Sequence, residues 1–188
     1  MKLVIAGKPN AGKSSLFNQL SSTNVYAENQ LFATLDPTLK RIDMGPFAFV
    51  LADTVGFIRQ LPHDLVNAFH ATLEEVKEAD LLLHVVDVSD ADKQIHINEV
   101  DKVIRQVGAE EVPQIIVYNK IDLLDRKNAG KDISSAVEAQ IVHDESGEVS
   151  QVLVSALENQ GLDLLKQAIQ TFFETTILSL TVKLSTSM

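Results

Sequence analysis

Gly7-Lys8-Pro9-Asn10-Ala11-Gly12-Lys13-Ser14 is the stretch of this sequence that decides the fold. It fits the pattern G-x-x-x-x-G-K-[ST], in which glycines allow a tight turn and backbone N–H groups surround phosphate oxygens. The apolar run Lys2–Ala6 before it predicts a buried strand, and the apolar spacing over Lys13–Leu20 predicts a helix. Strand, glycine loop and helix together predict the opening of a β-α-β unit with a phosphate group at the helix N-terminus.

Each residue type in this loop has a chemical reason to be there. Lys13 would place a compact positive charge on the β- and γ-phosphates, and Ser14 would offer its hydroxyl to Mg²⁺. The alternative is an accidental glycine turn, which the flanking strand and helix disfavour. The predicted phosphate-binding residues are Gly7, Lys8, Pro9, Asn10, Ala11, Gly12, Lys13, Ser14 and Ser15.

The rest of the chain alternates between strand and helix patterns. Gly45-Pro46 joins two strand patterns too closely for a parallel crossover, so that pair is expected to be antiparallel. We therefore predict an α/β, three-layer P-loop fold with a mostly parallel six-stranded sheet, one antiparallel edge strand and helices on both faces. The further predicted strands are 39–44, 47–52, 81–86, 114–118 and 149–154, and the further predicted helices are 64–78, 91–107, 131–142 and 162–175.

The chain has 188 residues, which fits one domain of the usual size of about 150 residues plus a short appendage. We expect an isolated nucleotide-binding domain over residues 1–175. Residues 176–188, rich in Ser and Thr, would be a tail or the truncated start of a C-terminal region, for instance its first strand.

Composition excludes several classes of protein. No cysteine is present, which excludes a disulfide framework and cysteine catalysis. The net charge of −10 argues against binding to DNA. No apolar run approaches the roughly 18 residues of a membrane span. We expect a cytoplasmic protein, with partial association with a membrane as an alternative.

A second motif, Asn119-Lys120-Ile121-Asp122, follows the predicted strand 114–118. In open parallel sheets, ligands bind beyond the carboxyl ends of the strands. The Asp122 carboxylate could accept hydrogen bonds from N1–H and the exocyclic amine of guanine, a donor pair that adenine lacks. Asn119 would tie the base pocket to the phosphate loop, and the stem of Lys120 would cover the ring. The alternative is that Asn119 or Asp122 only caps a turn.

Three further segments complete the predicted site. Ser155, Ala156 and Leu157 follow another strand and would lie near the base oxygen. Asp53-Thr54-Val55-Gly56 follows the strand 47–52, so that Asp53 could hold Mg²⁺ through water and the Gly56 N–H could bond the γ-phosphate. The long loop over residues 22–38 offers the hydroxyl of Thr34 or of Thr38 as a further Mg²⁺ ligand.

Three longer stretches make the chain resemble the HflX family of GTPases over residues 1–175. They are Gln30–Thr38, Leu51–Arg59 and Leu61–Val66. The resemblance implies a GTP-hydrolysing switch that binds GTP, GDP and Mg²⁺ and acts on the large ribosomal subunit to split or rescue stalled ribosomes. It also implies a first switch at Phe32, Ala33, Thr34, Leu35 and Asp36, with Thr34 as the Mg²⁺ ligand, and a catalytic set of Lys13, Thr34 and Gly56.

Several alternatives stay open beside this resemblance. Lys8-Pro9 looks more like related GTPases of ribosome assembly or tRNA modification. The chain could also be a GTP-dependent binding module with negligible hydrolysis. Phe57 stands where many GTPases place a water-orienting Gln, so we expect slow intrinsic hydrolysis that a partner accelerates. Asn10 could hold K⁺, as in related GTPases, or only stabilise the loop.

Two other groups of residues are not assigned to the site. His84 lies inside an apolar strand pattern and is expected to be a hydrogen-bonded core residue. Asp87, Asp90 and Asp92 crowd the end of the same strand, where we expect them to cap turns.

Overall fold

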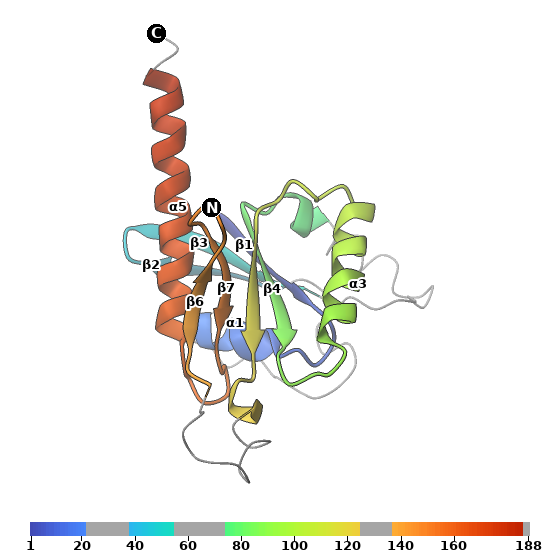
Figure 1. Ribbon diagram of the computed structural model, residues 1–188. Coiled ribbons are helices and arrows are strands. Elements are labelled where there is room, and N and C mark those ends of the chain that lie inside the picture. The colour runs from blue at the N-terminus through green and yellow to red at the C-terminus, as the bar shows by residue number, and fades with distance from the viewer. Residues whose placement is uncertain (22–37, 55–73, 125–136, 186–188) are drawn as a thin grey trace.

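The protein is described here from a computed structural model, which covers residues 1–21, 38–54, 74–124 and 137–185. Figure 1 shows one twisted sheet with helices packed on its two faces. The elements, in chain order, are β1 (Lys2–Gly7), α1 (Lys13–Ser21), β2 (Thr38–Met44), β3 (Phe47–Asp53), β4 (Leu81–Asp87), α3 (Lys93–Gln106), β5 (Gln114–Asn119), β6 (Gln140–His143), β7 (Val149–Leu153) and α5 (Leu162–Ser185).

The sheet has the strand order β2-β3-β1-β4-β5-β7-β6. The neighbouring pairs from β3 through β1, β4 and β5 to β7 are all parallel. The carboxyl ends of these strands therefore lie at the same end of the sheet. The predicted site residues follow β1, β3 and β5 at this end. The three-layer α/β fold predicted from the sequence is confirmed.

The prediction of six strands with one antiparallel edge is wrong in detail, because the sheet has seven strands and both of its edges are antiparallel. β2 pairs antiparallel with β3, as predicted, and β6 pairs antiparallel with β7. The extra strand β6 occupies the end of a segment, 131–142, that we predicted as a helix. Residues 137–139 are not helical either, and residues 131–136 lie outside the described residues.

Two apolar layers hold the helices to the sheet. Along β1, Leu3 and Ile5 belong to the core shared with α1 and α5, whereas Val4 and Ala6 belong to the core shared with α3. Burial on both faces is typical of a central parallel strand. The central strand is thus fixed on both sides, and with it the start of the loop that follows.

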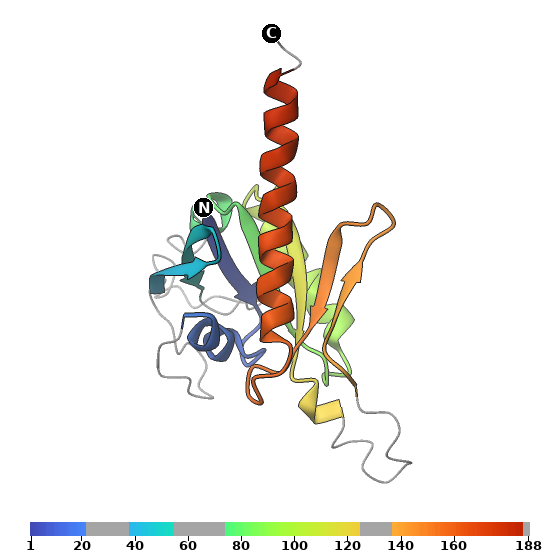
Figure 2. The ribbon, with the colours of Figure 1, turned by 90° about the vertical axis from the view of Figure 1, so that its left-hand side faces the viewer.

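The helix α5 is longer than the 162–175 that the sequence predicted. It runs without interruption to Ser185, and its C-terminal part extends beyond the sheet (Figures 1 and 2). The hydroxyls of Thr175 and Thr176 donate hydrogen bonds to the carbonyls of Thr171 and Phe172, one turn earlier. The possibility that residues 177–188 begin a strand is therefore wrong as far as Ser185, while the domain boundary near residue 175 stays a prediction.

No helix within the described ranges combines the length and the apolar character needed to cross a bilayer.

Candidate functional site

The two glycines of the phosphate loop are required by close approaches of other chain segments. Gly7 has a φ of 150°, and a Cβ there would collide with the backbone carbonyl of Val85 on β4. Gly12 has a φ of 94°, and a Cβ there would collide with the side-chain amide of Asn119. The loop between β1 and α1 is therefore pressed against the ends of β4 and β5, which only glycine permits at these two positions.

Lys13, the first residue of α1, is buried inside the loop with 7 % of its surface exposed. Its ammonium donates a hydrogen bond of 3.0 Å to the carbonyl oxygen of Lys8. Burial lowers the pKa of Lys13 from about 10.5 to about 8, although the nearby Asp53 carboxylate raises it. A desolvated ammonium at a helix N-terminus is poised to gain from a phosphate that restores opposite charge around it.

The next residue along α1 meets the end of β3. Ser14 Oγ donates a hydrogen bond of 2.9 Å to Asp53 Oδ2, and Asp53 is 1 % exposed. A hydroxyl and a carboxylate, both oxygen donors, are what Mg²⁺ prefers in proteins. The residues present therefore fit the predicted magnesium site, in which Ser14 would be a ligand and Asp53 would hold the ion through water.

Thr54 is directed away from this pair. Its hydroxyl donates a hydrogen bond of 2.6 Å to the carbonyl of Ile5 on β1, and the residue is 1 % exposed. Its side chain thus ties the end of β3 to β1, a structural role that the D-x-x-G pattern did not reveal.

Asn119 joins the phosphate loop to the predicted base pocket. It is 2 % exposed, its Nδ2 donates a hydrogen bond of 3.0 Å to the carbonyl of Ala11, and its Oδ1 accepts one of 2.9 Å from the N–H of Ala156. Gln19 Nε2 on α1 also donates to the carbonyl of Ala156, at 3.1 Å. The side chain does more than cap a turn, because it fixes two loops that lie far apart in the sequence.

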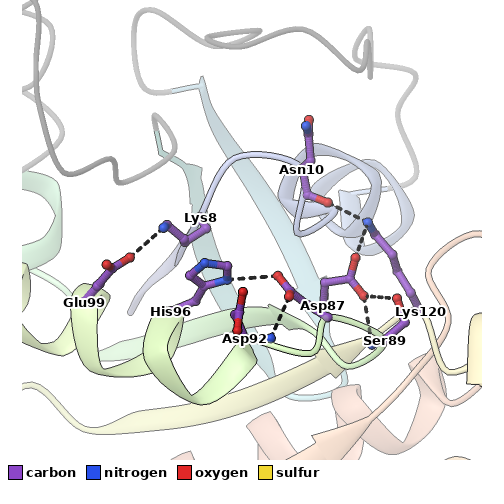
Figure 3. A network of polar contacts seen from close by, with 9 residues as sticks. Lys8, Asn10, Asp87, Ser89, Asp92, His96, Glu99 and Lys120 are labelled. Atoms are coloured by element: carbon purple, nitrogen blue, oxygen red, sulfur yellow. Dashed lines mark hydrogen bonds and ion pairs between the residues drawn. The ribbon is translucent and has the colours of Figure 1, made fainter.

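Lys120 extends this connection toward β4 (Figure 3). Its ammonium donates hydrogen bonds of 2.6 Å to the carbonyl of Asn10 and 2.7 Å to Asp87 Oδ2. Asp87 also accepts hydrogen bonds from the backbone N–H and hydroxyl of Ser89, which confirms its predicted turn role. Burial would raise the pKa of Asp87, but the hydrogen bonds from Lys120 and Ser89 hold it below its usual value. The sequence did not predict the ion pair between Asp87 and Lys120.

Asp122 is held by a serine of the third predicted segment. The hydroxyl of Ser155, which is fully buried, donates a hydrogen bond of 2.6 Å to Asp122 Oδ1. The N–H of Glu158 donates to the same hydroxyl at 3.1 Å, so the serine is itself fixed. Leu157, by contrast, is 73 % exposed. The predicted base-recognition residues are therefore brought together at one edge of the sheet.

Several predicted site residues lie outside the described residues: Phe32, Ala33, Thr34, Leu35, Asp36, Val55, Gly56 and Phe57. Thr38, the other candidate Mg²⁺ ligand, begins β2 and is paired in register with Asp53.

The sequence also did not reveal a contact between the phosphate loop and α3, and the prediction for one histidine was wrong in part. Lys8 Nζ donates a hydrogen bond of 2.6 Å to Glu99 Oε2 on α3, a glutamate with no motif around it. His84 is buried as predicted, but its Nδ1 has no hydrogen-bond partner among the described residues. Burial lowers the pKa of His84 to about 4, so the ring is neutral at pH 7.

The fold and the phosphate loop define a P-loop nucleotide-binding protein, and comparison with known proteins gives the family. The model for the 50S ribosome-binding GTPase family matches residues 2–120, and that for the elongation factor Tu GTP-binding domain matches residues 68–175. This chain belongs to the 50S ribosome-binding GTPase family.

Similar proteins support the resemblance to HflX. The chain is 45 % identical to the GTPase HflX of Escherichia coli (strain K12) over 166 residues, 88 % of this chain and 37 % of the relative. It is 47 % identical to the GTPase HflX of Caldanaerobacter subterraneus subsp. tengcongensis over 180 residues, 94 % of this chain and 38 % of the relative. The chain thus spans little more than a third of the length of these relatives.

A solved structure supports the fold. A GTP-binding protein from Sulfolobus solfataricus in complex with GDP is 27 % identical and superimposes with a TM-score of 0.64, covering 90 % of this chain and 51 % of that chain.

Proposed function

We propose that this chain binds GTP and Mg²⁺, hydrolyses GTP to GDP and phosphate, and is the nucleotide-controlled part of an HflX-type protein that acts on the large ribosomal subunit. The observation that carries the proposal is the position of Asn119, whose amide holds the phosphate loop at Ala11 and the base loop at Ala156 together. One residue thereby fixes the distance between a phosphate site and a base site. That distance is what recognition of a whole nucleotide requires.

Guanine selection rests on Asp122. Its carboxylate accepts a hydrogen bond of 2.6 Å from the Ser155 hydroxyl, which would orient it as an acceptor for both guanine donors. A site built around such a polar group rejects a base without the matching donors by as much as about 10⁴-fold. Adenine presents no such donor pair, so the same contact disfavours ATP.

Phosphate and metal binding rest on the loop and on two further residues. Lys13 would neutralise charge on the β- and γ-phosphates, and Ser14 with Asp53 would hold Mg²⁺, which when bound offsets the charge that develops during phosphoryl transfer. Thr34 would complete the magnesium ligands, and the Gly56 N–H would bond the γ-phosphate. The phosphate would then order both loops, and its hydrolysis would release them.

Hydrolysis by the chain alone is expected to be slow. Phe57 follows Gly56 in the sequence, and an apolar ring cannot orient water by hydrogen bonding. We infer that the ribosome completes the site.

A bound potassium ion beside Asn10 is an additional proposal. The backbone carbonyl of Asn10 accepts a hydrogen bond from Lys120, and the Asn10 side chain points away from that contact (Figure 3). Equal turnover in potassium and sodium buffers would count against the ion.

The ribosomal role follows from the names of the family and of the relatives, and a cytoplasmic location goes with it. A role in ribosome assembly or tRNA modification is the second candidate, favoured by Lys8-Pro9 in the loop. Binding of the full-length protein to mature large subunits rather than to assembly precursors or tRNA would separate the two.

Calorimetric titration with GDP, ADP and XDP in magnesium buffer tests the nucleotide assignment. We expect GDP to bind and ADP to bind at least about 10³-fold more weakly. Ser155→Ala, which frees the Asp122 carboxylate, should reduce this ratio, while Glu145→Gln on the exposed β6–β7 turn serves as a matched control. Equal affinity for GDP and ADP would contradict the proposal.

A further inference from the structure

The phosphate loop is held from outside at three of its residues. Lys120 and Asn119, at the end of β5, bind the backbone carbonyls of Asn10 and Ala11. The third tether comes from the opposite side, where Glu99 of α3 accepts a hydrogen bond from the side chain of Lys8 (Figure 3). The first two belong to the base-recognition motif, whereas nothing in the proposed function accounts for the third.

The Lys8–Glu99 pair is more than a surface contact. The two charged groups are 2.6 Å apart, and the Lys8 and Glu99 side chains are 25 % and 14 % exposed. Charge-assisted hydrogen bonds of this length are the strong ones, and partial burial reduces their screening by salt.

Lys8 also lines a cavity. A cavity of about 320 Å³ lies between the loop, the end of β4 and the start of α3, and its lining includes Lys8, Pro9, Val86 and His96. Among the described residues, the loop is therefore not closely packed along this cavity. On this side the loop is held instead by the hydrogen bond between Lys8 and Glu99 of α3.

Glu99 lies on a part of α3 that is packed against the sheet, and its partner Lys8 contributes a carbonyl oxygen that other residues of the loop bind. Val100, beside Glu99, and Ile104 are buried in the core between α3 and the sheet. At the other end, the carbonyl oxygen of Lys8 accepts hydrogen bonds from Lys13 Nζ at 3.0 Å and from the N–H of Ala11 at 3.3 Å. A displacement of Lys8 would thus displace the ammonium that the phosphates require.

We propose that Glu99 is a positioning residue for the phosphate loop, acting through Lys8 on Lys13, and that it slows the release of bound nucleotide. The inference rests on the proposed binding of guanine nucleotide to this loop. Glu99 would then act on the phosphate site through Lys8, and not on Asp122, the predicted base-recognition residue. Loss of Glu99 should weaken the hold on the phosphates without altering the preference for guanine.

The test is the dissociation rate of a fluorescent GDP analogue, chased with excess GDP. Glu99→Gln should accelerate release by about five- to tenfold, the effect of losing one charge-assisted hydrogen bond. Glu99→Asp keeps the charge on a shorter side chain and should fall between Glu99→Gln and the unmodified protein. Lys8→Gln should match Glu99→Gln, and the double variant should be no faster than either, because the two residues act as one unit.

Two controls separate positioning from general damage. Glu111→Gln removes the same charge from an exposed site in the turn after α3 and should leave the rate unchanged. The ratio of GDP to ADP affinity should be the same in Glu99→Gln as in the unmodified protein. Unchanged release in Glu99→Gln, or additive effects in the double variant, would overturn the inference while leaving the proposed function intact. Failure of the unmodified protein to bind GDP would instead remove the proposed function.

Discussion

Replacing Lys13 with Met should stabilise the nucleotide-free protein and abolish its binding of GDP. Lys13 is buried, with 7 % of its surface exposed, and its pKa is lowered from about 10.5 to about 8. The desolvated charge therefore costs the folded state free energy, which Asp53 offsets only in part and a bound phosphate would offset further. Met has a similar shape and carries no charge, so the cost disappears.

The magnitude follows from the shift in pKa. Lowering the pKa of Lys13 from about 10.5 to about 8 corresponds to a free-energy cost of about 3 kcal/mol for the charged folded state at pH 7. The lost hydrogen bond from Lys13 to the Lys8 carbonyl offsets about 1 kcal/mol of this. We therefore expect the free energy of unfolding of Lys13→Met to exceed that of the unmodified protein by about 2 kcal/mol at pH 7.

The effect has a defined pH dependence. Because the folded pKa of Lys13 lies below the unfolded value, the unfolded chain binds more protons between pH about 8 and 10.5, and stability rises with pH in this window. At pH 9.5 the free-energy cost of the buried Lys13 charge falls to about 1.5 kcal/mol. The difference in free energy of unfolding between Lys13→Met and the unmodified protein should therefore nearly vanish. Urea unfolding of both proteins without nucleotide, at pH 7 and 9.5, measures this difference. If Lys13→Met were less stable than the unmodified protein at pH 7, burial of the Lys13 charge would not be costly to the folded state.

Three further substitutions test other contacts of the site. Asp122→Asn should transfer the nucleotide preference from GDP to XDP, because an amide presents a donor where xanthine has an oxygen; calorimetry that still shows a preference for GDP would contradict the base assignment. Gly12→Ala places a Cβ against the Asn119 amide at a φ of 94° and should weaken GDP binding by more than about tenfold, as measured by the same titration. Asn119→Ala removes two buried hydrogen bonds and should lower the free energy of unfolding, measured in urea, by about 2–3 kcal/mol. A loss below about 0.5 kcal/mol is typical of a surface substitution and would show that Asn119 does not hold the two loops together.

Motifs at strand ends were predictable because the chemistry of phosphate and guanine demands particular residue types in a fixed order. The loop around Gly12 and Lys13 and the pair Asn119 and Asp122 lie where the sequence placed them. Glu99 could not be found in this way, because its partner Lys8 lies 91 positions away and no local pattern connects them. Such contacts depend on the packing of α3 against the sheet.

The two errors in the fold have local causes. β6 is only four residues long, too short for its alternation to stand out. A turn signal was present, since Asp144 Oδ1 accepts hydrogen bonds from the N–H groups of Ser146 and Glu148, a local contact that favours turns. The continuation of α5 was missed because Thr disfavours helices, yet Thr175 and Thr176 satisfy their hydroxyls on the preceding turn.

Phosphate release from GTP in potassium and magnesium buffer, with and without purified large ribosomal subunits, tests the central claim most directly. We expect slow release by the chain alone, acceleration by the subunits, and no release above background by Lys13→Met or from ATP. Release from GTP that does not exceed the Lys13→Met background, with or without the subunits, would contradict it.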